Sequence, residues 1–185
     1  SYSDWQSPAG AMIEASIYRK FWPDALLNSF QHTAPKIFDD IIAAHDSSPA
    51  SVSLCLCNDS QMRQINRQHR KIDKTTNVLS FSAYDMPSHR LETDAPALLG
   101  DIVISAETVT REAESFQIPV ADHLMHLFVH GMLHLFGYDH FDNDMAEIME
   151  SLEIKLLANI GIANPYQDTY CLLYTSPSPR DPSIS

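Results

Sequence analysis

The sequence predicts an α+β fold, in which a small mixed sheet of about four strands is covered by helices. Short apolar or alternating runs, typical of strands, lie between longer segments whose apolar residues recur at helical spacing. The two kinds of segment do not alternate strictly, as they would in a succession of βαβ units. Apolar residues make up 44% of the 185 residues, which is enough to build a core without disulfides.

Four short segments are predicted to be strands because they are rich in apolar residues, some of them alternating with polar ones. They are Met12 to Tyr18, Ser51 to Cys57, Asn77 to Ala83 and Gly100 to Ser105. Because side chains alternate between the two faces of a strand, Cys55 and Cys57 point to the same face. We interpret them as small buried side chains. Pro87, Pro96 and scattered polar residues predict a loop from Met86 to Ala97.

Five longer segments show helical periodicity. They run from Phe21 to His45, from Asp59 or Ser60 to Arg70, from Ser105 or Ala106 to Phe116, from Val120 to Phe136, and from Asp142 or Asn143 to Asn159. Pro35 is expected to break or kink the first helix, because proline removes a backbone donor. Val120 to Phe136 is the strongest helical pattern and is expected to be a central helix.

We predict a single domain over residues 1–170, followed by a tail. Residues 171–185 contain three prolines and four serines without periodicity, and resemble translated cloning or adaptor DNA. This segment is interpreted as non-native or disordered, so no functional role is assigned to Cys171. The first residues lack a secretory pattern, and the longest apolar stretch is too short to span a bilayer. We expect a cytoplasmic protein without a membrane partner.

The charge balance limits the nucleic-acid partners. The formal net charge is −12, from 24 acidic and 12 basic residues. Such a charge argues against indiscriminate coating of nucleic acid, and no DNA partner is expected. A basic run nevertheless follows Asp59, and it consists of Arg63, Arg67, Arg70, Lys71 and Lys74. This run is either a solvated helix face or a phosphate-binding stripe, since the guanidinium of arginine can bond two phosphate oxygens.

Histidines recur along the predicted central helix at positions 123, 126, 130 and 134, and another stands at 140. Two histidines four residues apart are about 6 Å apart along a helix and can share one ion, whereas His126 and His134 are about 12 Å apart and cannot. Gly137 can end the helix and turn the chain back. The spacing therefore predicts one transition-metal ion, taken as zinc, bound by His130, His134 and His140. His123 and His126 are expected to be structural.

The pattern H-x3-H-x5-H with a glycine before the last histidine matches the zinc-protease signature H-E-x-x-H-x-x-G-x-x-H, except that Gly131 replaces the glutamate. Because that glutamate is the general base, a metalloprotease is disfavoured. Gly131 is expected to leave space for substrate beside the ion. Three histidines without an obvious fourth ligand favour an open coordination position over a structural zinc. Asp101 has two possible roles. It either accepts a hydrogen bond from a metal-binding histidine, or it is a carboxylate at the start of a strand without a role in the site.

Four segments together resemble the YbeY family of bacterial rRNA maturation factors. They are NRQHRKIDKTTNVLSF (66–81), LGDIVIS (99–105), HGMLHLFGYDH (130–140) and MAEIMESLEIKLLANIG (145–161). The resemblance implies a zinc-dependent, single-strand-specific endoribonuclease that acts in rRNA processing, notably at the 16S 3′ end, and in ribosome quality control. It implies the metal ligands His130, His134 and His140, and makes Arg70 the family's arginine in the N-x-x-x-R element.

Single-stranded RNA and the ribosome or a ribosomal protein are therefore the expected partners. We expect Arg70 to bind the scissile phosphate as the catalytic residue, and no general base is evident. The alternative function is a non-catalytic assembly factor in which zinc braces a surface that docks on ribosomal protein or RNA. A metalloprotease is the third hypothesis.

Overall fold

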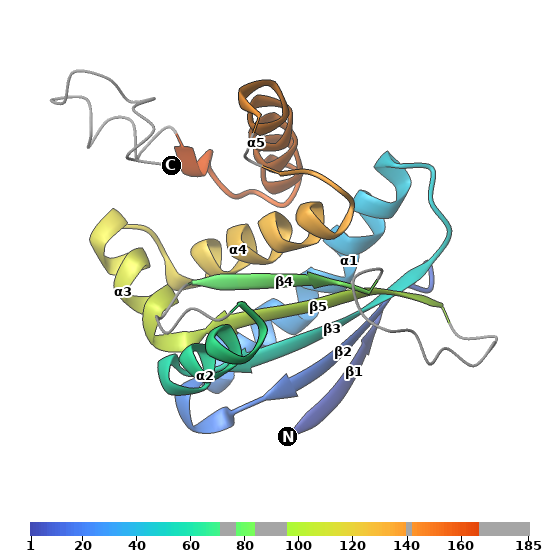
Figure 1. The fold of residues 1–185 in the computed structure, drawn as a ribbon. Coiled ribbons are helices and arrows are strands. Elements are labelled where there is room, and N and C mark those ends of the chain that lie inside the picture. Colours follow the sequence, from blue (N-terminus) through green and yellow to red (C-terminus); the bar gives the residue numbers. More distant parts are fainter. Residues whose placement is uncertain (71–76, 84–95, 140–141, 167–185) are drawn as a thin grey trace, which may run out of the picture.

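The computed structural model describes residues 1–70, 77–83, 96–139 and 142–166, with Arg70 described by its backbone alone. These residues form one five-stranded sheet in the order β1-β2-β3-β5-β4, flanked by helices (Figure 1). The strands are β1 (Tyr2–Gln6), β2 (Met12–Ile17), β3 (Ala50–Cys57), β4 (Val78–Ser82) and β5 (Ala97–Ser105). The α+β prediction is confirmed, with one strand more than expected.

The sheet is mixed. β3 pairs in parallel with β2 and with β5, whereas the outer pairs β1–β2 and β4–β5 are antiparallel. The sequence prediction missed β1, an edge strand in which only the Trp5 side chain is buried. Its pairing with β2 and the edge-on contact of Trp5 with Phe30, at 5.7 Å between ring centroids, define this strand.

The helices lie where periodicity predicted them, within about three residues at each end. They are α1 (Asp24–Ala44), α2 (Asp59–Arg70), α3 (Ala106–Phe116), α4 (Val120–Leu135) and α5 (Asn143–Ala158), and a short 3-10 helix, η1 (Arg19–Phe21), precedes α1. The predicted break at Pro35 does not occur, because α1 continues through it. Pro35 lies in the buried stripe of α1 beside Ala34, Ile37 and Phe38, and this packing compensates for the missing backbone donor.

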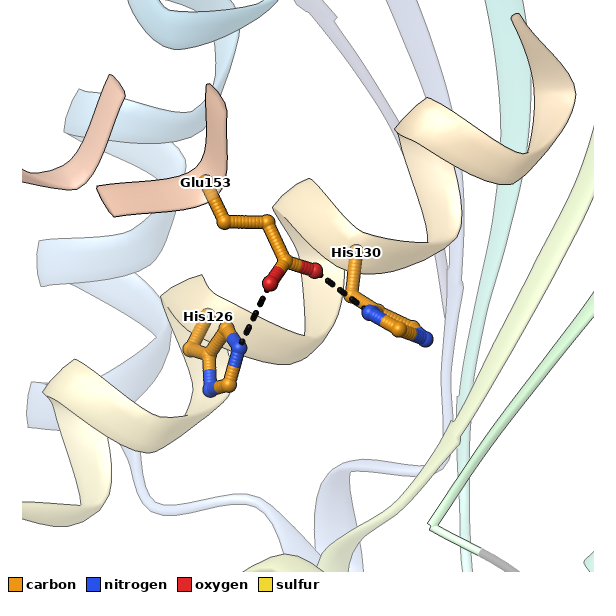
Figure 2. A group of neighbouring side chains, drawn as sticks. All are labelled: His126, His130 and Glu153. Atoms are coloured by element: carbon orange, nitrogen blue, oxygen red, sulfur yellow. Dashed lines mark hydrogen bonds and ion pairs between the residues drawn. The ribbon is translucent and has the colours of Figure 1, made fainter. Parts of the chain in front are cut away.

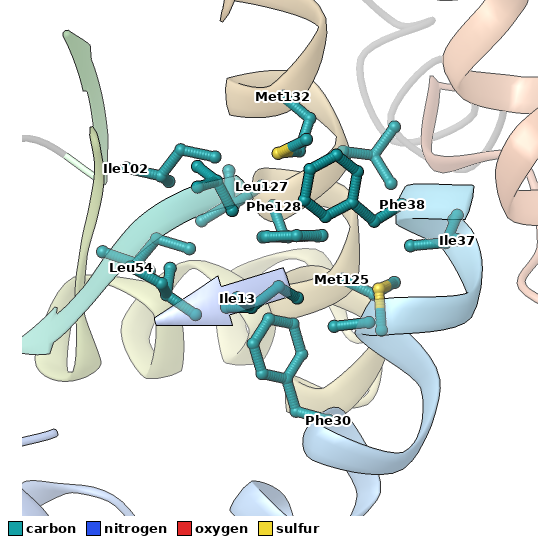
Figure 3. Close-up of a cluster of buried hydrophobic side chains, with 14 of the residues drawn as sticks. Ile13, Phe30, Ile37, Phe38, Leu54, Ile102, Met125, Leu127, Phe128 and Met132 are labelled. Carbon is teal, nitrogen blue, oxygen red and sulfur yellow. The ribbon is translucent and has the colours of Figure 1, made fainter. Parts of the chain in front are cut away.

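The main core lies between the sheet and the pair of helices α1 and α4 (Figure 3). Ile13, Leu54 and Ile102 reach it from the sheet, and the rings of Phe30 and Phe128 meet edge-on at 5.4 Å. A smaller cluster lies between α2 and the other face, where Cys57 and Met62 are buried and Cys55 is half-buried, as predicted for the C-x-C pair. α4 is thus held centrally, with the sheet, α1, α3 and α5 around it.

Within the described ranges, no helix has both the length and the hydropathy needed to cross a bilayer. The predicted tail, residues 171–185, lies outside the described residues, so the proposed domain boundary stays a prediction. Most of the loop expected from Met86 to Ala97 also lies outside them, but its end is wrong, because β5 begins at Ala97 and pairs there with β3.

Candidate metal centre

The end of α4 sets the geometry of the site. Gly137 has φ +103°, a conformation that favours glycine, and its N–H donates to the carbonyl of His134 over 3.0 Å. The N–H of Tyr138 donates to the carbonyl of Leu133 over 3.1 Å, which completes a Schellman motif. The predicted helix stop is confirmed. His140, the predicted third ligand, lies outside the described residues.

His130 and His134 converge at the centre of this region. Their Nε2 atoms lie 3.1 Å apart, and their rings are nearly perpendicular, at 82°. Two nitrogens bound to one tetrahedral zinc at about 2.0–2.1 Å would lie about 3.3 Å apart. Both histidines are partly exposed. The structure therefore brings together the two helical residues that the spacing singled out.

The far nitrogen of each ring is held by an acceptor. His130 Nδ1 lies 2.5 Å from a carboxylate oxygen of Glu153, and His134 Nδ1 lies 2.9 Å from the carbonyl of Tyr138. A carboxylate and a carbonyl only accept, so each Nδ1 carries a hydrogen, and Nε2 is the atom of each ring that could bind a metal ion. This arrangement is typical of metal-binding histidines, and the donor set fits zinc.

Glu153 is a residue of this region that the sequence analysis did not single out. It belongs to α5, and its side chain is fully buried (0% exposed) between the rings of His126 and His130 (Figure 2). Tyr166 also donates its hydroxyl to this carboxylate. Burial raises the pKa of Glu153, but hydrogen bonds from His126 and His130 outweigh burial and lower it to about 2. A lone glutamate at core spacing between Met149 and Leu156 was the available signal.

The described residues contain a second possible donor set, formed by His126, His130 and Glu153, whose ligand atoms lie within 4.8 Å of one another. His126 Nε2 is 3.5 Å from Glu153 and 3.3 Å from the hydroxyl of Tyr166. Because Glu153 is fully buried and already accepts hydrogen bonds, an ion there would have little room for substrate. We favour the pair of Nε2 atoms on His130 and His134, and the structural role of His126 stays a prediction.

His123 lies one turn before His126 and has a different partner. It is buried, and its Nε2 is 2.9 Å from Glu112 of α3, which also accepts from the Asn77 amide. Burial raises the pKa of Glu112, but the hydrogen bonds from His123 and Asn77 hold it below its usual value. These contacts agree with the structural role expected for His123.

The expectation that Gly131 leaves space for substrate is wrong. A Cβ at this position would lie 3.0 Å from Ser80 Oγ and 3.2 Å from a methyl carbon of Ile102. The Gly131 carbonyl also accepts a 3.2 Å hydrogen bond from Ser80. The missing side chain therefore lets α4 approach β4 and β5 closely. A glutamate here would have to displace the sheet, which further disfavours the protease hypothesis.

The remaining predicted residues lie around α2. Asp101 of β5 faces away from α4, because its neighbour Ile102 points toward Gly131. It lines a cavity of about 850 Å³ together with Ser53, Ile65 and His69, so it is not positioned to accept from His130 or His134. The Arg70 side chain lies outside the described residues, as do Lys71 and Lys74, so the phosphate-binding stripe stays a prediction.

Comparisons with known proteins agree on one family. The family model described as endoribonuclease YbeY matches residues 22–161. Proteins named endoribonuclease YbeY from Allorhizobium ampelinum and Francisella philomiragia are 44% and 42% identical to this chain. The first match covers 83% of this chain and 93% of the relative, and the second covers 76% and 92%. The solution structure of TM1509 from Thermotoga maritima is 22% identical with a TM-score of 0.50, covers 92% of this chain and 96% of that one, and supports the fold alone.

Proposed function

This chain belongs to the YbeY endoribonuclease family, and from that premise we propose that it is a zinc-dependent endoribonuclease that cleaves single-stranded RNA. The proposed roles are rRNA processing, in particular maturation of the 3′ end of 16S rRNA, and ribosome quality control. The proposed metal ligands are His130, His134 and His140.

One observation carries the proposal. The Nε2 atoms of His130 and His134 lie 3.1 Å apart, and both rings are partly exposed. Their Nδ1 atoms are hydrogen-bonded to the Glu153 carboxylate and to the Tyr138 carbonyl. Such a pair is preorganised, because the rings need not reorient when an ion binds.

The proposed site has two kinds of residue: histidines that bind the metal and an arginine that binds the phosphate. A zinc ion in such a site supplies Lewis acidity toward a phosphoryl oxygen or a water molecule. His130, His134 and His140 would hold that ion through their imidazole nitrogens. Arg70, at the end of α2, is proposed to bind the scissile phosphate and to offset the negative charge that builds up in the transition state.

A cleavage assay on a labelled single strand tests the proposal. Single-turnover cleavage is measured with the purified protein, after chelation, and after zinc is added back. We expect chelation to abolish cleavage and zinc to restore it, whereas a duplex of the same sequence stays intact. Cleavage that survives complete metal removal would refute the zinc-dependent mechanism.

The net charge of −12 supports a second candidate, a non-catalytic assembly factor that docks on a basic ribosomal protein. In that case the zinc would brace a surface, and ribosome binding would persist without RNA cleavage. The same assay separates the two functions, because the assembly factor would bind zinc and leave the labelled strand uncut.

A further inference from the structure

Three segments of the chain meet at the Glu153 carboxylate. It comes from α5, contacts the rings of His126 and His130 on α4, and accepts from the hydroxyl of Tyr166 beyond α5. Its side chain is completely buried, and a buried carboxylate is costly unless hydrogen-bonded partners surround it. A glutamine or an apolar residue would fill the same space at lower cost, so stability alone does not explain a carboxylate here.

We propose that Glu153 is a positioning residue of the metal centre, which holds the His130 ring so that its Nε2 faces the ion, and that Tyr166 holds Glu153 in turn. This inference rests on the proposed role of His130 as a ligand. The argument is geometric: the 2.5 Å contact lies on Nδ1, the nitrogen remote from His134. The acceptor therefore fixes both the tautomer and the orientation of the ring.

A matched pair on the same helix provides the control. Glu112 and His123 are joined in a similar way, by a 2.9 Å contact between a carboxylate and an imidazole nitrogen. His123 is buried and its ring packs on Phe116, 5.8 Å away between ring centroids, so its pair contributes to packing. Glu153→Leu and Glu112→Leu therefore remove the same kind of acceptor from two histidines of α4, only one of which is proposed to bind metal.

The first experiment measures zinc affinity by competition with a chromophoric chelator, for the full chain and both variants, with unfolding curves to confirm folding. Loss of an outer partner of a metal-bound histidine typically costs 10–100-fold in affinity. We expect the dissociation constant of Glu153→Leu to rise about tenfold or more, and that of Glu112→Leu to stay within about twofold of the unsubstituted protein. The visible spectrum of bound Co²⁺ should keep its shape in Glu153→Leu, because no ligand is lost.

The results separate this inference from the proposed function. Zinc affinity unchanged in Glu153→Leu overturns the positioning role alone, and an altered Co²⁺ spectrum overturns it by making Glu153 a direct ligand. An original protein that binds no zinc overturns both proposals. A second measurement needs no variant: nitrogen NMR of the zinc-bound protein should find the His130 hydrogen on Nδ1, and finding it on Nε2 would overturn the positioning role.

Discussion

The hydroxyl of Tyr138 lies 2.8 Å from Nε2 of His45, which joins the end of α1 to the turn after α4. His45 Nδ1 lies 2.7 Å from the carbonyl of Ile41, so it must donate, and Nε2 accepts from Tyr138. The carbonyl of the same Tyr138 holds the ring of His134. One residue thus links the packing of α1 to a proposed metal ligand.

Replacement of Tyr138 by phenylalanine should lower stability without removing the metal site. Tyr138→Phe deletes the hydrogen bond to His45 and leaves the backbone carbonyl in place, so we expect a loss of about 0.5–1.5 kcal/mol in the free energy of unfolding and unchanged zinc content. Urea unfolding and metal analysis measure the two quantities. Tyr18→Phe, on an exposed tyrosine, is the control, and equal effects of the two changes would contradict the prediction.

Exchange of single histidines should identify the ligands. His134→Ala should abolish stoichiometric zinc binding, because it removes one of the two converging Nε2 atoms. His126→Ala should retain the zinc, since its ring lies on the Glu153 side of the site. Metal analysis of the folded variants decides between the donor sets, and the opposite pattern would assign the ion to His126, His130 and Glu153.

Loss of the Arg70 side chain should slow RNA cleavage and leave the metal in place. Arg70→Ala removes the proposed phosphate contact, and a lost electrostatic partner of a transition state typically costs about 10²–10³ in rate. Arg70→Lys should recover only part of the rate, since lysine lacks the planar fork. The control is Lys36→Ala, which removes a positive charge from the exposed side of α1. This variant should cleave RNA at the same rate as the unsubstituted protein. Full activity in Arg70→Ala would disprove its role.

A methyl group at position 131 should destabilise the protein. In Gly131→Ala the new Cβ lies 3.0 Å from Ser80 Oγ, and overpacking of this kind costs about 1–3 kcal/mol, against a gain of about 1 kcal/mol in helix propensity. We therefore expect a net loss of about 1 kcal/mol in the free energy of unfolding. The loss should shrink in a Ser80→Ala background. Equal losses in both backgrounds would show that Ser80 is not the obstacle.

Asp59 should make stability depend on acid pH. Burial raises the pKa of Asp59, but hydrogen bonds from Ser105, Thr108 and Arg111 outweigh it and hold the pKa below the ordinary 3.8. The folded protein thus favours the ionised form, and the resulting stability is present above pH 3.8 and disappears as the pH falls through the lowered pKa.

The free energy of unfolding of the original protein and Asp59→Asn, measured from pH 7 to pH 3, tests this expectation. The difference between the two proteins should be constant down to about pH 4.5 and then decrease. Asp40→Asn, which changes an exposed carboxylate on α1, should show little difference at any pH. A difference for Asp59→Asn that grows on acidification would contradict the assignment.

Sequence by itself determined the features that depend on neighbours along the chain. The periodicity located α1 to α5, and the four-residue spacing placed His130 and His134 on one face of α4. Gly137 predicted the end of that helix, which its positive φ confirms. These features follow from hydrogen bonds and side-chain directions within one or two helical turns, so a local pattern is sufficient to predict them.

Tertiary structure decided the features that depend on contacts between distant segments. Strand β1 exists because it pairs with β2, Gly131 packs against Ser80 across 51 positions, and Glu153 reaches His130 across 23. No local pattern assigns a partner to a buried carboxylate or shows which atoms a glycine lets approach. Those partners are fixed only when the helices pack on the sheet, because close packing determines which side chains share each space.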